Sequence, residues 1–402
     1  MDFTLPADVD AQRLKVRDFI EQHVIGLEND PASFNEYQNI KLSLRDDIRV
    51  KAKAAGLWAP QMPVARGGMG LNMVAQAALY EEANRSIFGP VSINCGAPDD
   101  GNMRVLEQVG TEAQKEEFLQ PIVDGKVNSS FVMTEPHPGG GSDPSMIQTR
   151  AERKGDTWVV HGNKWYISAA DIAEHFILMA RTDDNPDEKR RHLTGFLFHR
   201  DQPGWKITRR IRNMGPDEHG GVCELEFDGL EIPDSNRLME VGDGLKVTQI
   251  RLGPARLTHC MRWLGLSKRC MEIAAEYTNR REGFGMRLAD RESVQLKMGQ
   301  VAQSIQTGRL LVMHAAWKLD QGDFARKEVS MAKTHVADTL HLAADTALQL
   351  NGARGYSCDT VIEWIYRYAR CARIVDGASE VHNMVLSRFY GKESNDFWSW
   401  GN

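Results

Sequence analysis

The hydrophobic period of this chain changes twice along its length, and no other feature restricts the possible folds as strongly. From about residue 4 to residue 127, apolar residues recur at spacings of three and four between Pro and Gly breaks, as they do in amphipathic helices. From about residue 128 to residue 236 the pattern becomes a series of short alternating runs, which is typical of strands. From about residue 242 the helical period returns in long stretches.

This order predicts an α+β protein whose C-terminal helices lie side by side in a four-helix bundle, because long amphipathic helices usually pack in that way. Three domains of ordinary size are expected. They are an N-terminal all-α domain at 1–127, a middle antiparallel β-domain at 128–237 and a C-terminal helical bundle at 238–402.

Within the β-domain, six runs are predicted to be strands, and Gly-Asp at 155–156 and Gly-Asn at 162–163 are predicted to be turns between them. The charged run 183–192 is expected to be a solvated loop. The predicted strands are Thr157–His161, Lys164–Ser168, Phe176–Arg181, Thr194–His199, Trp205–Arg209 and Val222–Phe227. The predicted C-terminal helices are Gly253–Arg281, Arg291–Gln321, Phe324–Asn351, Thr360–Arg370 and Gly377–Phe389.

Charge and cysteine usage exclude several classes of protein. The 49 Lys and Arg against 55 Asp and Glu give a net charge of −6, which argues against a nucleic-acid or anionic-membrane surface. The six Cys form no C-x-x-C pair, so they are expected to be reduced and mostly buried. No 18-residue apolar window and no secretory signal are visible. We therefore expect no membrane span and a cytoplasmic bacterial enzyme, with a mitochondrial or peroxisomal location left open for a eukaryotic source.

Two segments of the β-domain have residues suited to a planar or anionic ligand. Met133 and Thr134 precede a loop with three adjacent glycines before Ser142, and such a loop lets backbone N–H groups approach a ligand closely. Tyr166 follows Trp165 on a predicted strand, with Ser168 two residues on, so a ring and a hydroxyl could meet a heterocycle. Taken alone, a flexible turn and ordinary sheet packing are the favoured explanations of these two segments.

Further candidates lie in the helical C-terminal part. Arg281 and Phe284 follow a predicted helix and suit a pyrophosphate and a base, although an ordinary helix end would contain similar residues. Asp376 precedes Gly377 and a helix, where it could cap the helix or point into a cleft as a base. The 12 His are scattered, and neither G-x-S-x-G nor H-E-x-x-H occurs, so no metal is expected.

Together these segments resemble the acyl-CoA dehydrogenase family over essentially the whole chain, in the family's order and spacing. Among members, the chain is most similar to the branch represented in animals by the tenth and eleventh members. The motifs that carry the resemblance are Met133-Thr-Glu-Pro136, Trp165-Tyr-Ile-Ser168, Arg281-Glu-Gly-Phe-Gly285, Gln349 with Gly352 and Gly355, and Asp376-Gly377. The segments that indicate the branch are Gly101–Met103, Gln249–Arg256, His259–Arg262 and Asp376–His382.

The resemblance implies FAD as cofactor, held between the β-domain and the bundle. Met133 and Thr134 would contact the isoalloxazine edge, Tyr166 and Ser168 its other side, and Ser142 the flavin phosphate or the substrate. The flavin of a neighbouring subunit would be contacted by Arg281, Phe284, Gln349 and Gly352. A homodimer or homotetramer is therefore expected.

The resemblance also implies the reaction. An acyl-CoA substrate would lie near Ser142, Arg256, Asp376 and Gly377, a carboxylate would remove its α-proton, and the β-hydride would pass to flavin N5. Electrons would go on to an electron-transferring flavoprotein, as in fatty acid β-oxidation. Asp376 is the expected base, with a pKa raised by burial; most members have Glu there, and the alternative position used by some members is Ala255 in this chain.

Two other functions remain open from the sequence. The first keeps the fold and the flavin but changes the chemistry to that of an oxidase or of a non-oxidative elimination. The second is a flavin-free structural or binding protein on the same scaffold. The loop 134–143 is longer than the usual loop of the family, which leaves the contacts of Ser142 open.

Overall fold

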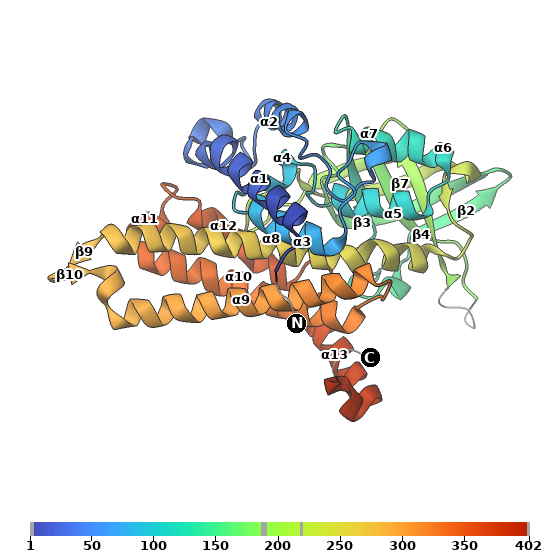
Figure 1. The fold of residues 1–402 in the computed structure, drawn as a ribbon. Helices are drawn as coiled ribbons and strands as arrows, with labels where there is room; N and C mark the ends of the chain where they lie inside the picture. Colours follow the sequence, from blue (N-terminus) through green and yellow to red (C-terminus); the bar gives the residue numbers. More distant parts are fainter. Residues whose placement is uncertain (1–3, 186–190, 218–219, 400–402) are drawn as a thin grey trace.

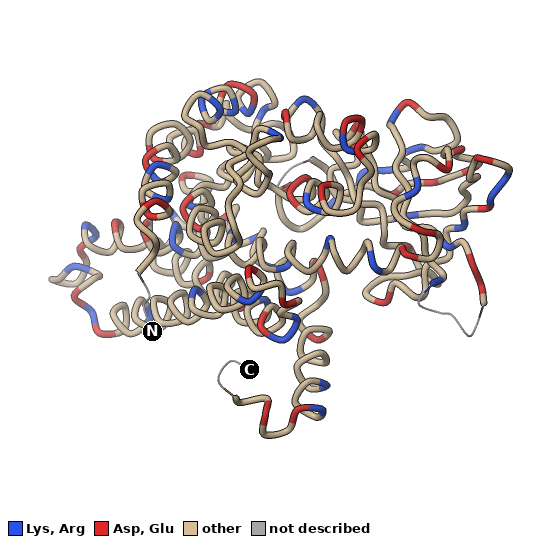
Figure 2. Tube along the Cα trace, turned by 45° about the vertical axis from the view of Figure 1, so that its right-hand side comes forward, with Lys and Arg blue, Asp and Glu red and all other residues tan. Residues whose placement is uncertain are grey.

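The computed structural model describes residues 4–185, 191–217 and 220–399, and its three regions follow each other along the chain (Figure 1). The N-terminal region is helical, the central region is a sheet, and long helices form the C-terminal region. The predicted α+β class is therefore confirmed. Figure 2 shows acidic and basic residues interspersed along the trace of all three regions.

The N-terminal helices pack against the first long helix of the bundle. Among them, α3 and α5 both contact α8. The α-helices of this region are α1 (Ala7–His23), α2 (Leu42–Ala54), α3 (Met73–Ala83), α4 (Gly89–Ser92), α5 (Asp99–Val109), α6 (Glu112–Gln114) and α7 (Gln120–Val123).

The central region is an eight-stranded sheet with the order β6-β7-β3-β2-β4-β5-β8, and β1 pairs with β4. The predicted antiparallel arrangement holds for most neighbours, but β1 runs parallel to β4, and one residue pair links β2 and β4 in parallel. The strands are β1 (Asn128–Val132), β2 (Arg150–Lys154), β3 (Thr157–Ser168), β4 (Ala173–Arg181), β5 (Leu193–His199), β6 (Trp205–Arg210), β7 (Val222–Pro233) and β8 (Arg237–Leu238).

The alternation of strand β4 divides the protein core in two. Phe176 and Leu178 point into a core enclosed by the sheet, whereas Ile177 and Met179 belong to the larger core formed with the helices. This division follows from the period of two residues along a strand, which sends successive side chains to opposite faces. Both faces of β4 are therefore buried along this stretch.

The predicted turn at Gly162 is wrong, because β3 runs without interruption from Thr157 to Ser168. Gly162 has a φ of +144°, and a Cβ there would lie 2.6 Å from Oγ1 of Thr149. The glycine therefore permits close contact with the neighbouring segment rather than a reversal of the chain. The predicted Gly155 turn does occur, between β2 and β3. Residues 186–190 of the predicted charged loop lie outside the described residues.

The C-terminal region has α10 at its centre, in contact with α8, α9, α12 and α13. Its first helix begins nine residues before the predicted start, because the chain stays helical through Pro254. A two-stranded hairpin of β9 (Glu282–Gly283) and β10 (Met286–Arg287) joins α8 to α9. The helices are α8 (Gly244–Arg280), α9 (Glu292–Asp320), α10 (Arg326–Asn351), α11 (Ala353–Tyr356), α12 (Ile362–Ala369) and α13 (Ser379–Glu393).

Two general expectations can be compared with this fold. All six cysteines are free thiols, and four of them are buried, as the sequence predicts. Within the described ranges, no helix combines the length and the apolar character that crossing a membrane requires.

Candidate active site

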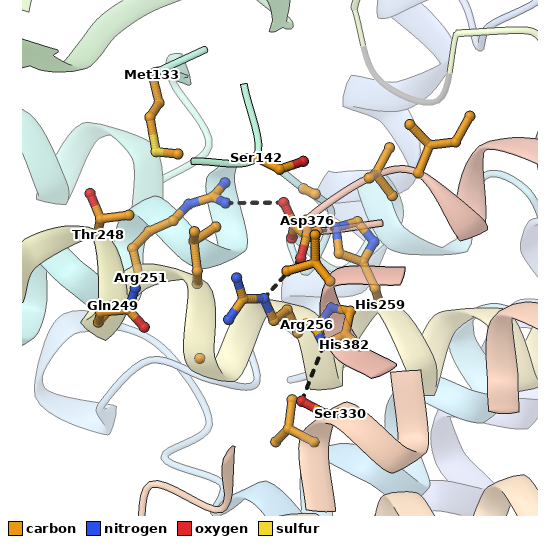
Figure 3. A pocket seen from close by; sticks show the side chains of 18 of the residues that line it. Met133, Ser142, Thr248, Gln249, Arg251, Arg256, His259, Ser330, Asp376 and His382 are labelled. Carbon is orange, nitrogen blue, oxygen red and sulfur yellow. Dashed lines mark hydrogen bonds and ion pairs between the residues drawn. The ribbon is translucent and has the colours of Figure 1, made fainter. Parts of the chain in front are cut away.

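A cavity of about 2100 Å³ lies where one end of the sheet meets α8, the start of α10 and α13. Pockets for one small molecule usually measure roughly 300–1,000 Å³, so this cavity has room for two ligands together. Figure 3 shows the side chains around Asp376 at its centre. Predicted site residues that line the cavity are Met133, Thr134, Ser142, Tyr166, Ser168, Arg256, Asp376 and Gly377.

The sheet side of the cavity is formed where β3 leaves its regular pairing. The register between β3 and β7 shifts between Lys164 and Ile167, and Tyr166 there adopts a φ of +51°. Trp165 instead bonds to Thr134, donating its N–H to the Thr134 carbonyl at 3.0 Å and accepting the Thr134 hydroxyl at 2.7 Å. This local departure leaves the Tyr166 side chain 53% exposed beside the cavity.

A buried ion pair also supports the segment that contains Met133 and Thr134. Lys164 Nζ lies 2.8 Å from Glu135 Oε1 and donates to the Met133 carbonyl at 2.8 Å. Burial lowers the pKa of Lys164 to about 8, although the Glu135 charge acts in the opposite direction. Glu135 also accepts the backbone N–H groups of Gln148 and Thr149. The positions of Met133 and Thr134 therefore depend on a pair of charges inside the protein.

The backbone around Asp376 has an uncommon conformation and is held by two cations. Asp376 has a φ of +52° and Gly377 a φ of +98°. Arg256 Nε donates to the Asp376 carbonyl at 2.8 Å, and Lys333 Nζ donates to the carbonyls of Gly377 and Ala372, both at 2.8 Å. Left-handed backbone is strained for a residue other than glycine and persists only where its surroundings impose it.

The Asp376 carboxylate faces a group of positive or hydrogen-bonding side chains from α8 (Figure 3). His259 Nε2 lies 3.2 Å from Oδ2, and Arg251 lies 3.8 Å from Oδ1. Burial raises the pKa of Asp376, but the neighbouring His259 and the Arg251 and Arg256 charges lower it by more, so the net shift is downward. The expected upward shift is therefore wrong, because α8 supplies charges that the sequence argument left out.

The alternative position for a base holds no acid. Ala255 is buried on α8, next to Arg256. Elsewhere along the cavity, Glu328 pairs with Lys318 at 3.4 Å, and Asp217 pairs with Arg210. Asp376 is therefore the carboxylate that the fold brings together with Arg251 and Arg256.

Four predicted residues do not line the cavity of this chain. Arg281 follows the last residue of α8, and Phe284 lies fully exposed in the β9-β10 hairpin (Figure 1). Gln349 and Gly352 lie at the end of α10, where Arg354 of the following helix stacks on Tyr277 of α8. Helices rise 1.5 Å per residue, so Arg281 lies roughly 37 Å along α8 from Arg256. These residues therefore lie toward the opposite end of the bundle from Asp376.

The sequence argument did not select Arg251, His259 and Arg262 as site residues. Together with Ala255 they are spaced by four, four and three residues, which places them on one face of α8. All four side chains are buried. One signal could have identified these three residues. They are polar, and they recur along one face of a helix among buried neighbours.

Residues 7–126, 130–230 and 242–391 match the sequence profiles of the N-terminal, middle and C-terminal domains of acyl-CoA dehydrogenase. The chain belongs to the acyl-CoA dehydrogenase family. It is 34% identical to the probable acyl-CoA dehydrogenase FadE2 of Mycobacterium tuberculosis, over 96% of each chain. It is also 34% identical to acyl-CoA dehydrogenase family member 11 of Gallus gallus, matching 94% of this chain but only 49% of that protein.

Solved structures of acyl-CoA dehydrogenases have the same fold. Butyryl-CoA dehydrogenase from Megasphaera elsdenii is 27% identical, with a TM-score of 0.84 over 96% of this chain and 99% of that one. Glutaryl-coenzyme A dehydrogenase, in its complex with glutaryl-CoA, is 26% identical, with a TM-score of 0.86 over 100% of this chain and 99% of that one.

Acyl-CoA dehydrogenases are flavoproteins, and the cavity residues fit such a cofactor. The Thr248 side chain is fully buried at the cavity wall, and its hydroxyl has no hydrogen-bond partner among the described residues. A buried hydroxyl without a partner is costly, and a bound polar ligand would supply one. The half-exposed ring of Tyr166 offers a face to a planar group on the sheet side.

Proposed function

We propose that this acyl-CoA dehydrogenase binds FAD and converts an acyl-CoA thioester to the 2,3-enoyl-CoA, with Asp376 as the base that removes the α-proton. One observation supports this most directly: Asp376 lies in a cavity large enough for two ligands, with its carboxylate kept ionised by α8. An ionised carboxylate is the form that accepts a proton, and no other carboxylate described along the cavity lies beside Arg251 and Arg256.

A lowered pKa makes Asp376 a weaker base, so the substrate must be made more acidic. The α-proton of a thioester becomes acidic when negative charge on the carbonyl oxygen is stabilised. The cations of Arg251 and Arg256 supply positive potential in this part of the cavity. In the proposed mechanism, the fixed backbone of Asp376 and Gly377 presents the carboxylate to the α-carbon.

FAD, when bound, supplies an acceptor for the hydride from the substrate β-carbon. Met133, Thr134, Tyr166 and Ser168 would hold its ring system, and all four line the sheet side of the cavity. Ser142 would contact the flavin phosphate or the substrate, with Arg256 and Gly377 on the substrate side. The electrons would pass to an electron-transferring flavoprotein.

The proposal includes a cofactor shared between subunits of a homodimer or homotetramer. Arg281, Phe284, Gln349 and Gly352 would contact the flavin of the neighbouring subunit. Their position far from the cavity of their own chain supports this assignment, because they can serve a flavin only from another copy.

The test is anaerobic titration of the purified holoenzyme with a panel of acyl-CoA thioesters, followed by the flavin absorbance. We expect one class of acyl chain to bleach the flavin band in the parent enzyme and to leave it unchanged in Asp376→Asn. Asp376→Asn that retains FAD and is still reduced at the parent rate would refute the role of Asp376.

Two further outcomes separate the alternatives. Rapid reoxidation of the reduced flavin by oxygen would indicate an oxidase, whereas a dehydrogenase transfers its electrons to an electron-transferring flavoprotein. A flavin that no thioester reduces, with release of a substituent from the acyl chain, would indicate a non-oxidative elimination. A protein that cannot be reconstituted with FAD would exclude all three enzymes.

A further inference from the structure

A continuous series of polar contacts links the N-terminal helix α5 to the proposed base. Asp100 on α5 accepts the Thr258 hydroxyl at 2.9 Å and lies 3.8 Å from Arg262. Arg262 donates to Nδ1 of His259 at 3.1 Å, and Nε2 of His259 faces Asp376 at 3.2 Å. The Arg262 side chain is only 1% exposed, so water does not compete for these contacts.

The contact with Arg262 determines where His259 carries its proton. A guanidinium has only donors, so Nδ1 of His259 must accept its hydrogen bond. The proton of the neutral imidazole therefore lies on Nε2, which is the nitrogen beside Oδ2 of Asp376. A second proton has no place on Nδ1 while Arg262 occupies it.

We propose that His259 and Arg262 are positioning residues for the reaction: Arg262 fixes the tautomer of His259, and His259 thereby holds the Asp376 carboxylate with a neutral donor. This inference rests on the proposed function, in which Asp376 is the base. A neutral donor orients the carboxylate without forming the full ion pair that an imidazolium would form, and so leaves the base more reactive.

The structure fixes Arg262 from several sides. Its NH1 also donates to the Cys95 carbonyl at 3.0 Å, and Asp100 is held in turn by Arg104 at 3.0 Å. His259 itself is stacked on Trp263, with ring centroids 5.3 Å apart. These contacts come from the segment before α5, from α5 and from α8, so the orientation of His259 depends on the packing of the N-terminal region against the bundle.

The charged and titratable groups near His259 come from four helices and from the segment before α13. They are Arg251, Arg256 and Arg262 on α8, Asp376 on the segment before α13, Asp100 on α5 through Arg262, Lys333 on α10 and His382 on α13. Of these, only Arg262 contacts Nδ1 of His259 in the described residues. Removing Arg262 is therefore the change that frees this nitrogen to take a proton.

The first test measures thermal unfolding of the holoenzyme against pH in two matched pairs. One pair is Arg262→Met and the double variant Arg262→Met with His259→Gln; the other is the parent and His259→Gln. Without Arg262, Nδ1 of His259 is open to a proton, and the imidazolium that forms would pair with the Asp376 carboxylate and stabilise the fold. That stabilisation is present below about pH 6.5 and is lost as pH rises.

We expect the melting temperature of Arg262→Met to gain about 2 to 4 °C over its double variant between pH 8 and pH 5.5. Both members of this pair lack Arg262, so the altered surroundings of Asp100 cancel. The parent pair should show no such pH dependence. Arg49→Met, which removes another buried arginine that bonds to backbone carbonyls, controls for the loss of a buried cation. The proposal would be overturned if the melting-temperature difference between Arg262→Met and its double variant did not change with pH.

The second test needs no change at Arg262. A Gln side chain at 259 places its amide nitrogen near the position of Nε2, whereas Asn places it near Nδ1. We expect His259→Gln to retain flavin reduction within about tenfold of the parent, and His259→Asn and His259→Leu to lose on the order of a hundredfold at saturating substrate. Equal losses in Gln and Asn would contradict the proposal.

The two tests also distinguish this inference from the proposed function. If Asp376→Asn is reduced by acyl-CoA at the parent rate, Asp376 is not the base, and the proposed function fails whatever the unfolding data show. If Asp376→Asn is inactive but the melting-temperature difference in the Arg262→Met pair does not change with pH, Asp376 remains the base and the proposed role of Arg262 is wrong. The unfolding measurement requires no substrate, so an unidentified acyl group does not affect it.

Discussion

Lys164 and Glu135 form a 2.8 Å ion pair that is almost fully buried behind the strand ends bearing Met133 and Thr134. The pair joins two segments of the cavity wall, because Lys164 also bonds to the Met133 carbonyl. Two charges inside a protein are tolerated only together, since either one alone would lose its solvation without compensation.

Glu135→Gln is expected to destabilise the protein by about 3–5 kcal/mol, because it leaves the Lys164 charge buried without a partner. The double variant Glu135→Gln with Lys164→Met should recover much of this loss. Urea unfolding at pH 7 measures both. Flavin content should fall in the single variant, since the Met133 segment loses its support. A double variant no more stable than the single one would contradict this account of the pair.

Gly377→Ala tests the backbone that presents Asp376. A Cβ on Gly377 would lie 3.1 Å from Nε2 of His382, in backbone with a φ of +98°. Gly322→Ala is the matched control, because Gly322 has a φ of +84° and its Cβ would meet nothing within 4 Å. Both variants should lose about 1–2 kcal/mol of stability from the left-handed backbone. Only Gly377→Ala should also slow single-turnover flavin reduction, by at least about tenfold.

The lowered pKa of Asp376 predicts how the reaction depends on pH. The pKa of a free carboxylate of this kind is about 3.9, and that of Asp376 is lower in the folded protein. Such a carboxylate stabilises the fold at every pH above its unfolded-state pKa, and it loses this contribution only as the pH falls through its folded-state pKa. The rate of flavin reduction should therefore show no acid limb from Asp376 between about pH 5 and 8. Arg251→Gln removes one of the charges that lower the pKa of Asp376. In this variant the rate of flavin reduction should therefore begin to fall at a higher pH than in the parent. Stopped-flow reduction across this range checks both.

Arg281→Ala tests the shared cofactor. We expect this variant to retain less FAD, because a charge-assisted contact to the pyrophosphate is lost. Mixing Arg281→Ala chains with Asp376→Asn chains should restore flavin reduction, since a mixed dimer has one site with both residues intact. Mixtures as inactive as the separate variants, or an Arg281→Ala variant with unchanged flavin content, would exclude a flavin contact from the neighbouring subunit.

The sequence predicted the architecture because the signal for it is local. The change of hydrophobic period near residues 128 and 242 marks the sheet and the bundle without any knowledge of what packs against them. The same local argument failed at Gly162, where a turn residue stands inside a strand. It also placed the start of α8 nine residues too late, at Gly253 instead of Gly244.

For the site, the sequence by itself determined the residue types: Asp376 before Gly377, and Ala255 where another base could have been. Only the tertiary structure decided their environment. Arg256 reaches the Asp376 carbonyl across 120 residues of chain, and Arg262 reaches Cys95 across 167. Such contacts depend on how α5, α8 and the segment before α13 pack together. Because His259, Arg251 and Arg256 together outweigh burial, the pKa of Asp376 falls where its burial alone predicted a rise.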